Sequence, residues 1–593
     1  MKFFRTFLAA LLAVVVGSFM MGFLWILALV GIAGTMESTT AVQPESVLVI
    51  NLDEDISDSP VTNPFNNIDF NTMSTVRHMS LYSALRAIDA AAGDSRIKGI
   101  YLRLNGQGSA DITTLEELRE TIAQFKESGK FVVAYNETYG QFGYYLASVA
   151  DRVYLQPEGM ILWNGITFNV AFYKGLLDKL DIEPEVFRPT ACKYKSAVEP
   201  YILTKMSDAN RRQMTELAES IWGSVTAAVS ESRSIPVAKL NELADNLSAM
   251  FPEEALANGL VDGLVYEDQM NDVFAEYGVE AGRDGEYNMV TLGEYAMQVG
   301  ADLSNVSADR VAIVYAEGQI VDGNGEYDAI YGNTMAERIK SVRLDDKVKA
   351  VVLRVNSPGG SALASDVIWR ELELLKAEKP VIVSMGGYAA SGGYYISAPA
   401  DVIIADKMTL TGSIGVFGMY MNVGKALKDK LGITFDGVKT NTLSDFGNAT
   451  RPMTAVERAT IMRSVDNVYE TFTGLVAKGR NLPVEKVLDI AGGRVWSGSE
   501  AVELGLADGN GGLKTAIAVA ADKAALGENY RIVEVTEMPA GLMSFFTAFN
   551  AQVRERALRS ELGSALYGHY DRIREAMRVN GVVAYCPYDI RFE

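Results

Sequence analysis

The chain has 593 residues, which is more than one ordinary domain and predicts several. Its composition, 48% hydrophobic and 22% charged, is that of a globular protein. A formal net charge of −21, without a basic cluster, excludes a non-specific nucleic-acid binder, because such a protein needs a basic face.

The first predicted element is an uncharged apolar helix over residues 7–33. At about 1.5 Å per residue it reaches about 40 Å, more than the roughly 30 Å hydrocarbon core of a bilayer. A cleaved signal peptide is the alternative, but its apolar segment runs only about 7–15 residues. We therefore expect an uncleaved anchor. Residues 1–6 would stay in the cytoplasm, because Lys2 and Arg5 precede the helix, and everything after Glu37 would lie on the other side.

A linker over residues 34–47 is expected to lead into two copies of one domain. The N-terminal repeat is predicted over 48–300 and the C-terminal repeat over 301–537. Each begins with an apolar, β-branched strand and continues as helix, strand, loop, helix and strand. This alternation predicts βαβ units, a mainly parallel sheet and hence an α/β fold. The tail over 538–593 is expected to form one or two amphipathic helices for packing or oligomer contact.

The duplication is visible in the sequence letters. IYLRLNGQGSA (100–110) matches VVLRVNSPGGSA (351–362). The period is far too long for a solenoid, so it indicates tandem domains. The residues that could carry chemistry are not repeated: Gln141 fills the position of Ser391, and KYKSAVEP (193–200) has no counterpart with a lysine. We therefore expect the two halves to have specialised differently.

Ser391 is the predicted nucleophile. It lies in AASGG (389–393), after a strand that ends near Met385 and at the start of a helix. A serine in such a turn faces the carboxyl edge of a parallel sheet, where clefts form. Because Ala389 stands in place of glycine, the GxSxG pattern is not met. A helix N-cap serine explains the position equally well.

Gly359 and Gly360 follow a predicted strand and precede a helix that begins near Ala362. Backbone N–H groups at a helix start bind anions. Together with the N–H of Gly392, these glycines are predicted to hold the oxyanion of a tetrahedral intermediate. A plain tight turn is the alternative.

Lys195 is the predicted general base, because a serine nucleophile needs one and histidine is scarce. At its usual pKa of about 10.4 a lysine is protonated at pH 7, so the role requires burial in an apolar pocket. Lys193 competes for the role, and most lysines are solvated surface residues. Ser413, in LTGSIGVFG (410–418), is a further candidate that could hold the neutral amine, although its local pattern favours an ordinary turn serine.

Histidine and cysteine are too rare to suggest other chemistry. The only histidines, His78 and His569, lie outside any glycine-rich turn, so a Ser-His-Asp triad is poorly supported. The only cysteines, Cys192 and Cys586, match neither a zinc site nor a disulfide framework, and the sequence leaves open whether they pair. No metal or other cofactor is expected.

Four motifs occur together in the chain: NSPGGS (356–361), YAASGGYYIS (388–397), TGSIGV (411–416) and YKSAVEP (194–200). In combination they resemble the signal peptide peptidase A, or protease IV, family in its long, duplicated and membrane-anchored form. The resemblance covers nearly the whole chain and implies tandem Clp/crotonase-like domains. The roles it implies are Ser391 as nucleophile, Lys195 as general base and proton donor, Gly392 and Gly360 as oxyanion donors, and Ser413 as support for the lysine.

The resemblance also implies where the protein acts and on what. It implies a serine endopeptidase that assembles as a homotetramer on the bacterial inner membrane, with the N-terminal helix in the lipid bilayer and the catalytic body on the periplasmic side. Its substrates would be cleaved signal peptides and other unfolded apolar peptides, cut through an acyl-enzyme.

Two rival functions are weighed against this one. A crotonase-like acyl-CoA enzyme shares the fold, but coenzyme A is cytoplasmic and the body is expected outside the cytoplasm. A catalytically inactive, membrane-anchored scaffold that binds peptides would not need a serine and a lysine. Ser391 and Lys195 are nevertheless both present, each in the half that lacks the other.

Overall fold

The computed structural model describes most of the body of the chain. The described residues are 42–51, 55–60, 78–104, 110–282, 285–299, 309–325, 329–536 and 581–586, with positions 14, 17, 68–69, 74–75, 558, 563, 567 and 570. The predicted anchor over 7–33 lies outside them, except for Val14 and Gly17. Within the described part of the chain, no helix is both long and apolar enough to span a bilayer.

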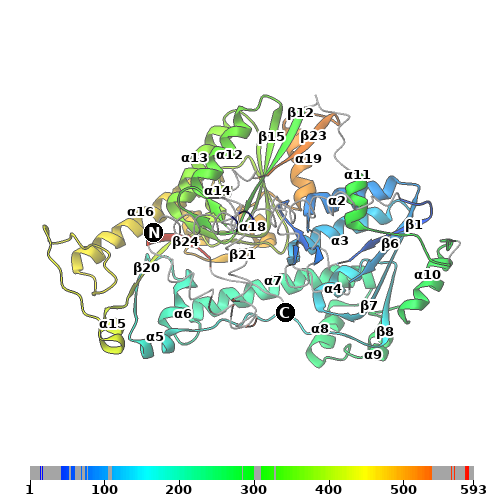
Figure 1. Cartoon of the computed structure of the whole chain (residues 1–593), viewed down its shortest axis with the longest axis horizontal. Coiled ribbons are helices and arrows are strands. Elements are labelled where there is room, and N and C mark those ends of the chain that lie inside the picture. Colours follow the sequence, from blue (N-terminus) through cyan, green and yellow to red (C-terminus); the bar gives the residue numbers. More distant parts are fainter. Residues whose placement is uncertain are drawn as a thin grey trace.

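The N-terminal repeat contains a six-stranded sheet in which every pairing is parallel. Its order is β10-β8-β7-β6-β1-β11, and it lies on the right in Figure 1. Strand β1 is buried along its whole length, as expected for a strand covered on both faces, and it begins inside the predicted linker. The strands are β1 (Ser46–Ile50), β6 (Ile97–Arg103), β7 (Phe131–Tyr139), β8 (Arg152–Ile161), β10 (Gly263–Leu264) and β11 (Met289–Thr291), and the helices used below are α3 (Ile112–Lys126), α4 (Gln141–Ala147) and α7 (Asp208–Arg233).

The C-terminal repeat has the same design in an eight-stranded sheet. Its main path is β21-β19-β17-β15-β12-β23, and β18 and β22 extend from β17. All pairings are parallel except that of β19 with β21. The two sheets confirm the predicted α/β class. The strands are β12 (Asp309–Glu317), β15 (Val348–Ser357), β17 (Val381–Ala390), β18 (Val402–Ala405), β19 (Leu410–Gly412), β21 (Val495–Ser497), β22 (Gly509–Asn510) and β23 (Tyr530–Val535), and the helices used below are α13 (Ala362–Lys376), α14 (Gly392–Ser397) and α17 (Val484–Ile490).

A third, mixed sheet joins the repeats and includes one strand from the tail. Its order is β14-β13-β16-β24-β20-β9. The prediction of a helical tail is wrong for β24, which lies antiparallel between β16 and β20. A short apolar run does not reveal its partners, and β24 forms because two strands distant in sequence flank it. The strands are β9 (Glu183–Phe187), β13 (Ile320–Val321), β14 (Ile330–Tyr331), β16 (Gly359–Ser361), β20 (Phe417–Asn422) and β24 (Gly581–Tyr585).

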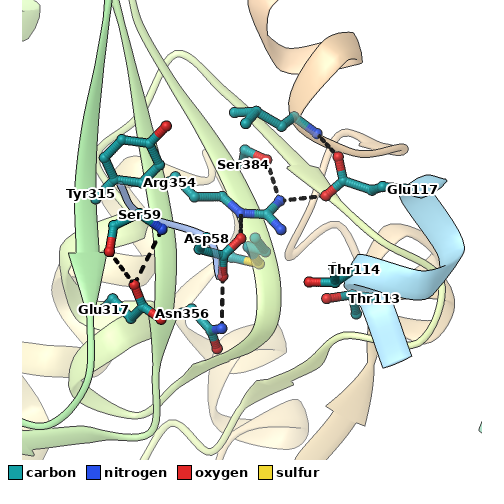
Figure 2. A network of polar contacts seen from close by, with 12 residues as sticks. Asp58, Ser59, Thr113, Thr114, Glu117, Tyr315, Glu317, Arg354, Asn356 and Ser384 are labelled. Carbon is teal, nitrogen blue, oxygen red and sulfur yellow. Dashed lines mark hydrogen bonds and ion pairs between the residues drawn. The ribbon is translucent and has the colours of Figure 1, made fainter. Parts of the chain in front are cut away.

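A buried ion cluster lies where the two repeats meet (Figure 2). Arg354 on β15 donates from Nε to Asp58 at 2.7 Å, and its Nη1 forms a 2.8 Å ion pair with Glu117 on α3. Asn356 donates a further 2.7 Å bond to Asp58. Asp58 and Glu117 belong to the N-terminal repeat. Burial raises the pKa of both carboxyl groups, although the positive charge of Arg354 acts to lower it. Charges this deeply buried tie the repeats together, because separating them leaves each without a partner.

Candidate active site

Ser391 occupies the turn between β17 and α14 in an unusual backbone conformation. Its φ is 56° and its ψ is −112°, a region that residues with side chains rarely adopt. Its N–H donates to the Gly412 carbonyl at 2.9 Å, and its side chain makes no capping bond to α14. The geometry therefore does not match the alternative of a helix N-cap serine, and the buried hydroxyl is directed elsewhere.

Lys195 reaches Ser391 from the other repeat. Its Nζ lies 2.7 Å from Ser391 Oγ. It also donates to the carbonyl and the hydroxyl oxygen of Ser413, both at 2.9 Å. All three residues are buried, and Lys195 is only 1% exposed. The tertiary structure thus brings together the three side chains that the sequence singled out at widely separated positions.

Burial controls the protonation of this amine. Desolvation lowers the pKa of Lys195 to about 8, and the nearby thiols of Cys586 and Cys192 oppose the shift. The carboxylate of Glu199, four residues along the chain, does not serve the lysine. It accepts hydrogen bonds from the N–H of Ser207 at 3.1 Å and from its hydroxyl at 2.6 Å. A large fraction of the amine is therefore neutral near pH 8, as a general base requires.

The loop that carries Lys195 is held by residues of both repeats. The Arg188 side chain donates to the Lys195 carbonyl at 2.9 Å, and the Tyr194 N–H donates to the Gly492 carbonyl at 3.0 Å. Gly493 has a φ of 81°, and a Cβ placed on it would lie 2.6 Å from the backbone N and from the Cβ of Lys195. Only glycine allows this approach, so the C-terminal repeat positions the lysine that the N-terminal repeat supplies.

Two other candidate residues, Lys193 and Ser413, are placed differently by the structure. Lys193 lies away from the site, whereas Ser413 contacts the Lys195 amine. Lys193 is exposed, and its ammonium lies 5.1 Å from the centroid of the Tyr194 ring. Ser413 has a φ of 48° and donates its N–H to the Arg494 carbonyl at 2.7 Å. This conformation lets both its carbonyl and its hydroxyl face the Lys195 amine.

The glycines predicted to bind an oxyanion lie on two elements. Gly392 is the first residue of α14, directly after Ser391. Gly360 precedes helix α13, as predicted, and lies in β16, where it is paired with Ile320 of β13. A Cβ on Gly359 would lie 2.5 Å from the Gly392 nitrogen. Gly359 is therefore the glycine in contact with that amide, a distinction that the repeated glycines in the sequence did not reveal.

Two features of the site were missed from the sequence. The first is Gly493, for which the only signal was a pair of glycines after helix α17. The second is the approach of β24 to the same turn, for which there was no signal beyond a short apolar run. Among the residues that the structure describes, no group of three or more His, Cys, Asp and Glu side chains is arranged to hold a metal ion.

Comparison with known proteins identifies relatives over most of the chain. The profile of peptidase family S49 matches residues 124–280, which contain Lys195, and residues 373–527, which contain Ser391. Protease 4 of Haemophilus influenzae is 35% identical over 84% of this chain and 82% of its own length. Protease 4 of Salmonella typhi is 38% identical over 75% of this chain and 72% of its own. The chloroplastic serine protease SPPA of Arabidopsis thaliana is 34% identical over 78% of this chain and 69% of its own.

Proposed function

Because the chain belongs to peptidase family S49 and is therefore a serine peptidase, we propose that Ser391 is its nucleophile and Lys195 its general base. The observation that carries the proposal is the 2.7 Å distance between Lys195 Nζ and Ser391 Oγ in a buried setting. A general base must lie within about 2.6–3.2 Å of the group whose proton it takes. The lowered pKa of Lys195 supports the same role.

The contacts of Ser413 suit a neutral lysine. An uncharged amine has two N–H donors and one lone pair. Ser413 offers two acceptors, its carbonyl and its hydroxyl, each 2.9 Å from Lys195 Nζ. If both donors are engaged there, the lone pair is left for the proton of Ser391 Oγ. Ser413 would thus orient the base without touching the substrate.

The proposed reaction is acyl transfer to serine followed by hydrolysis. Lys195 takes the proton of Ser391 as the serine oxygen attacks a peptide carbonyl. The resulting oxyanion accepts hydrogen bonds from backbone N–H groups, for which we propose Gly392 and Gly360. The lysine then passes its proton to the leaving amine. A water molecule, deprotonated by the same amine, releases the acyl group and restores the serine.

The finer description of the protein also belongs to this proposal. We propose that each repeat is a Clp/crotonase-like domain, which the parallel sheets support. For cleaved signal peptides and other unfolded apolar segments as substrates, the support is the resemblance of the motifs. The apolar run over 7–33 supports a single-pass anchor, with the body on the periplasmic side of the bacterial inner membrane. For a homotetramer the support is the resemblance of the motifs.

The two rival functions fare differently. The S49 relationship gives no support to an acyl-CoA enzyme. An inactive peptide-binding scaffold differs from the proposed peptidase in one measurable respect, since it would not react with a serine-directed fluorophosphonate. Such labelling therefore separates the rivals before any substrate is known.

The test uses Ser391→Ala and Lys195→Ala in the full chain, with hydrolysis of an extended apolar peptide as the readout. We expect each change to lower kcat by at least about 10³-fold, because nucleophile and base act as a unit. Both variants should keep the circular dichroism of the parent. Lys193→Ala is the matched control and should keep parental activity, because this lysine is exposed. Near-parental turnover in either dyad variant would refute the assignment.

A further inference from the structure

One face of helix α7 in the N-terminal repeat contacts strand β21 of the C-terminal repeat, and Figure 1 shows the two elements next to each other. Three side chains on one side of the helix make these contacts: Gln213, Glu216 and Ser220. The Val495 N–H donates to the side-chain oxygen of Gln213 at 3.3 Å. Glu216 forms an ion pair with Arg494, just before the strand. The Ser220 hydroxyl donates to the Ser497 hydroxyl at 2.8 Å.

Gln213 differs from the other two side chains because it also reaches the loop that carries Lys195. Its Nε2 donates to the Tyr194 carbonyl at 3.0 Å and to the Ser196 hydroxyl oxygen at 2.9 Å. These two residues stand directly before and after Lys195 in the chain. The side chain of Gln213 is buried, with 1% of the residue exposed. One buried side chain therefore holds the lysine loop on both sides of Lys195 and the edge of the C-terminal repeat at the same time.

The contacts of Gln213 require both ends of a primary amide. Val495 presents an N–H group, which needs an acceptor, and Tyr194 presents a carbonyl group, which needs a donor. Glutamine offers an acceptor oxygen and an NH2 group on one side chain. A glutamate of the same shape has no donor when ionised, and a methionine of similar length has no N–H donor and only a weakly accepting sulfur. Hydrogen bonding, and not only space, therefore selects glutamine at this position.

A second polar side chain of α7 supports the same loop. Asn210 accepts hydrogen bonds from the Ser196 hydroxyl at 3.0 Å and from Gln213 at 3.1 Å, and it donates to Glu199 at 3.1 Å. All four residues are buried. Because a buried polar group that loses its partner is destabilising, the members of this network hold one another in place. Gln213 is the member that carries the network across to Val495 in the C-terminal repeat.

We propose that Gln213 is a positioning residue for the reaction, because it holds the Lys195 loop where the amine meets Ser391. Gly493 limits how closely the loop can approach the C-terminal repeat, since a Cβ there would lie 2.6 Å from Lys195 atoms. Gln213 keeps the loop from moving away. The distance from Lys195 Nζ to Ser391 Oγ is 2.7 Å, and proton transfer requires about 2.6–3.2 Å. This inference rests on the proposed function, because it takes Lys195 as the base.

The first experiment replaces Gln213 with methionine, which is similar in length and flexible enough to fill the space. The readout is kcat per active site, with the sites counted by complete labelling with a fluorophosphonate. We expect Gln213→Met to lower this value by at least about tenfold with KM nearly unchanged, because the base is displaced and not the substrate. Ser220→Ala is the matched control. It removes a bond between the same helix and strand, but that bond leads to Ser497, so kcat per site should stay parental.

The pH profile separates positioning from a purely structural role, which would lower the number of folded molecules without changing the profile. A loosened loop should admit water to the Lys195 amine, and weaker desolvation raises its pKa from about 8 towards about 10.4. The pH at which kcat/KM begins to fall should therefore move upward in Gln213→Met and stay unchanged in Ser220→Ala. The thiols of Cys192 and Cys586, which also act on this pKa, are present in both variants. A parental profile in Gln213→Met would overturn the proposal, even if kcat falls.

A second variant covers the case in which Gln213→Met does not fold. Gln213→Glu keeps the shape of the side chain and the acceptor for the Val495 N–H, but it turns a carboxylate oxygen towards the Tyr194 carbonyl. Since two acceptors repel each other, we expect kcat per site to fall by at least about tenfold here as well. Parental kcat per site in Gln213→Glu would show that the donor is not needed, which also overturns the proposal.

The final arm does not depend on catalysis. Amide hydrogen exchange, followed by mass spectrometry, reports how firmly the segment 190–200 is held. We expect faster exchange of this segment in Gln213→Met and parental exchange in Ser220→Ala, and equal exchange in all three proteins would contradict the proposed role of Gln213. If the exchange rises as expected while Lys195→Ala keeps parental hydrolysis, the proposed function fails and the positioning of the loop stands.

Discussion

The two repeats hold their frameworks with the same contacts but use the same turn for different purposes. The Tyr144 hydroxyl donates to the Leu260 carbonyl at 2.7 Å, and the Tyr394 hydroxyl donates to the Leu506 carbonyl at 2.8 Å. Two aspartates likewise accept a backbone N–H at the start of equivalent strands, Asp151 at 2.8 Å and Asp401 at 2.9 Å.

The turns between strand and helix differ. In the N-terminal repeat the side-chain oxygen of Gln141 accepts the Gly165 N–H at 2.7 Å, which ties α4 to a neighbouring loop. Gln141 itself is the first residue of α4 and does not have a positive φ. In the C-terminal repeat Ser391 has a φ of 56°, and its hydroxyl meets the Lys195 amine. At equivalent positions, Gln141 thus makes a structural hydrogen bond in one repeat, whereas Ser391 is the candidate nucleophile in the other.

The largest expected effect comes from exchanging the side chains at the turn between strand and helix. Ser391→Gln gives the C-terminal repeat the side chain of the N-terminal one, and we expect kcat to fall by at least about 10³-fold, because the proposed nucleophile is removed. Gln141→Ser is the reverse change. It should leave hydrolysis unchanged, since no lysine serves that turn, while urea unfolding reports a loss of about 1 kcal/mol for the lost bond to Gly165. Residual hydrolysis in Ser391→Gln that disappears on adding Gln141→Ala would contradict this view.

The second prediction concerns a pair of arginines at equivalent positions. Arg354 is buried with Asp58 and Glu117, whereas Arg103 is half-exposed in an ion pair with Glu267. We expect Arg354→Met to lower the free energy of unfolding by about 3–5 kcal/mol, because it leaves buried carboxylates without a partner. Arg103→Met should cost no more than about 1 kcal/mol. Equal losses in denaturant unfolding would show that the cluster does not join the repeats.

The third prediction tests how the C-terminal repeat positions Lys195, the proposed base, which the N-terminal repeat supplies. In Gly493→Ala the new Cβ would lie 2.6 Å from Lys195 atoms, so we expect the loop to shift and kcat to fall about 10²-fold. Gly129→Ala is the matched control. Its φ of 79° is close to the 81° of Gly493, but nothing lies within 4 Å of the new Cβ. It should therefore cost stability without loss of kcat at saturating substrate.

The fourth prediction concerns the pH dependence of activity. The pKa of Lys195 is about 8, and only the neutral amine can take a proton. The neutral fraction falls tenfold for each pH unit below the pKa, so kcat/KM at pH 6 should be about one hundredth of its plateau above pH 9. Ser413→Ala removes one hydrogen-bond acceptor from the amine and should shift the pH at which kcat/KM begins to fall. Lys193→Ala should leave that pH unchanged. A profile that is flat from pH 6 to 9 would exclude Lys195 as the base.

Much of the fold was predictable because it depends on local patterns. Alternating apolar strands and helices predicted the α/β class, and the internal match predicted two similar sheets. The positions of Ser391 and Lys195 in opposite halves pointed to a shared site. The helix start near Ala362 was also predicted correctly, but the short strand β16 that holds Gly360 just before it was not predicted. The strand pairing that decides this involves Ile320, about 40 residues away in sequence.

The sequence by itself determined which side chains are available: one serine in a strand–helix turn, a lysine in the opposite half, and glycines at both turns. Only the tertiary structure decided that Lys195 is buried within 2.7 Å of Ser391, that Gly493 fits against it, and that β24 lies across the site. The physical reason is the distance along the sequence over which each kind of interaction acts. Periodicity and turn chemistry act over a few residues, whereas desolvation of the amine and the pairing of β24 depend on surfaces that meet only when the two repeats pack together.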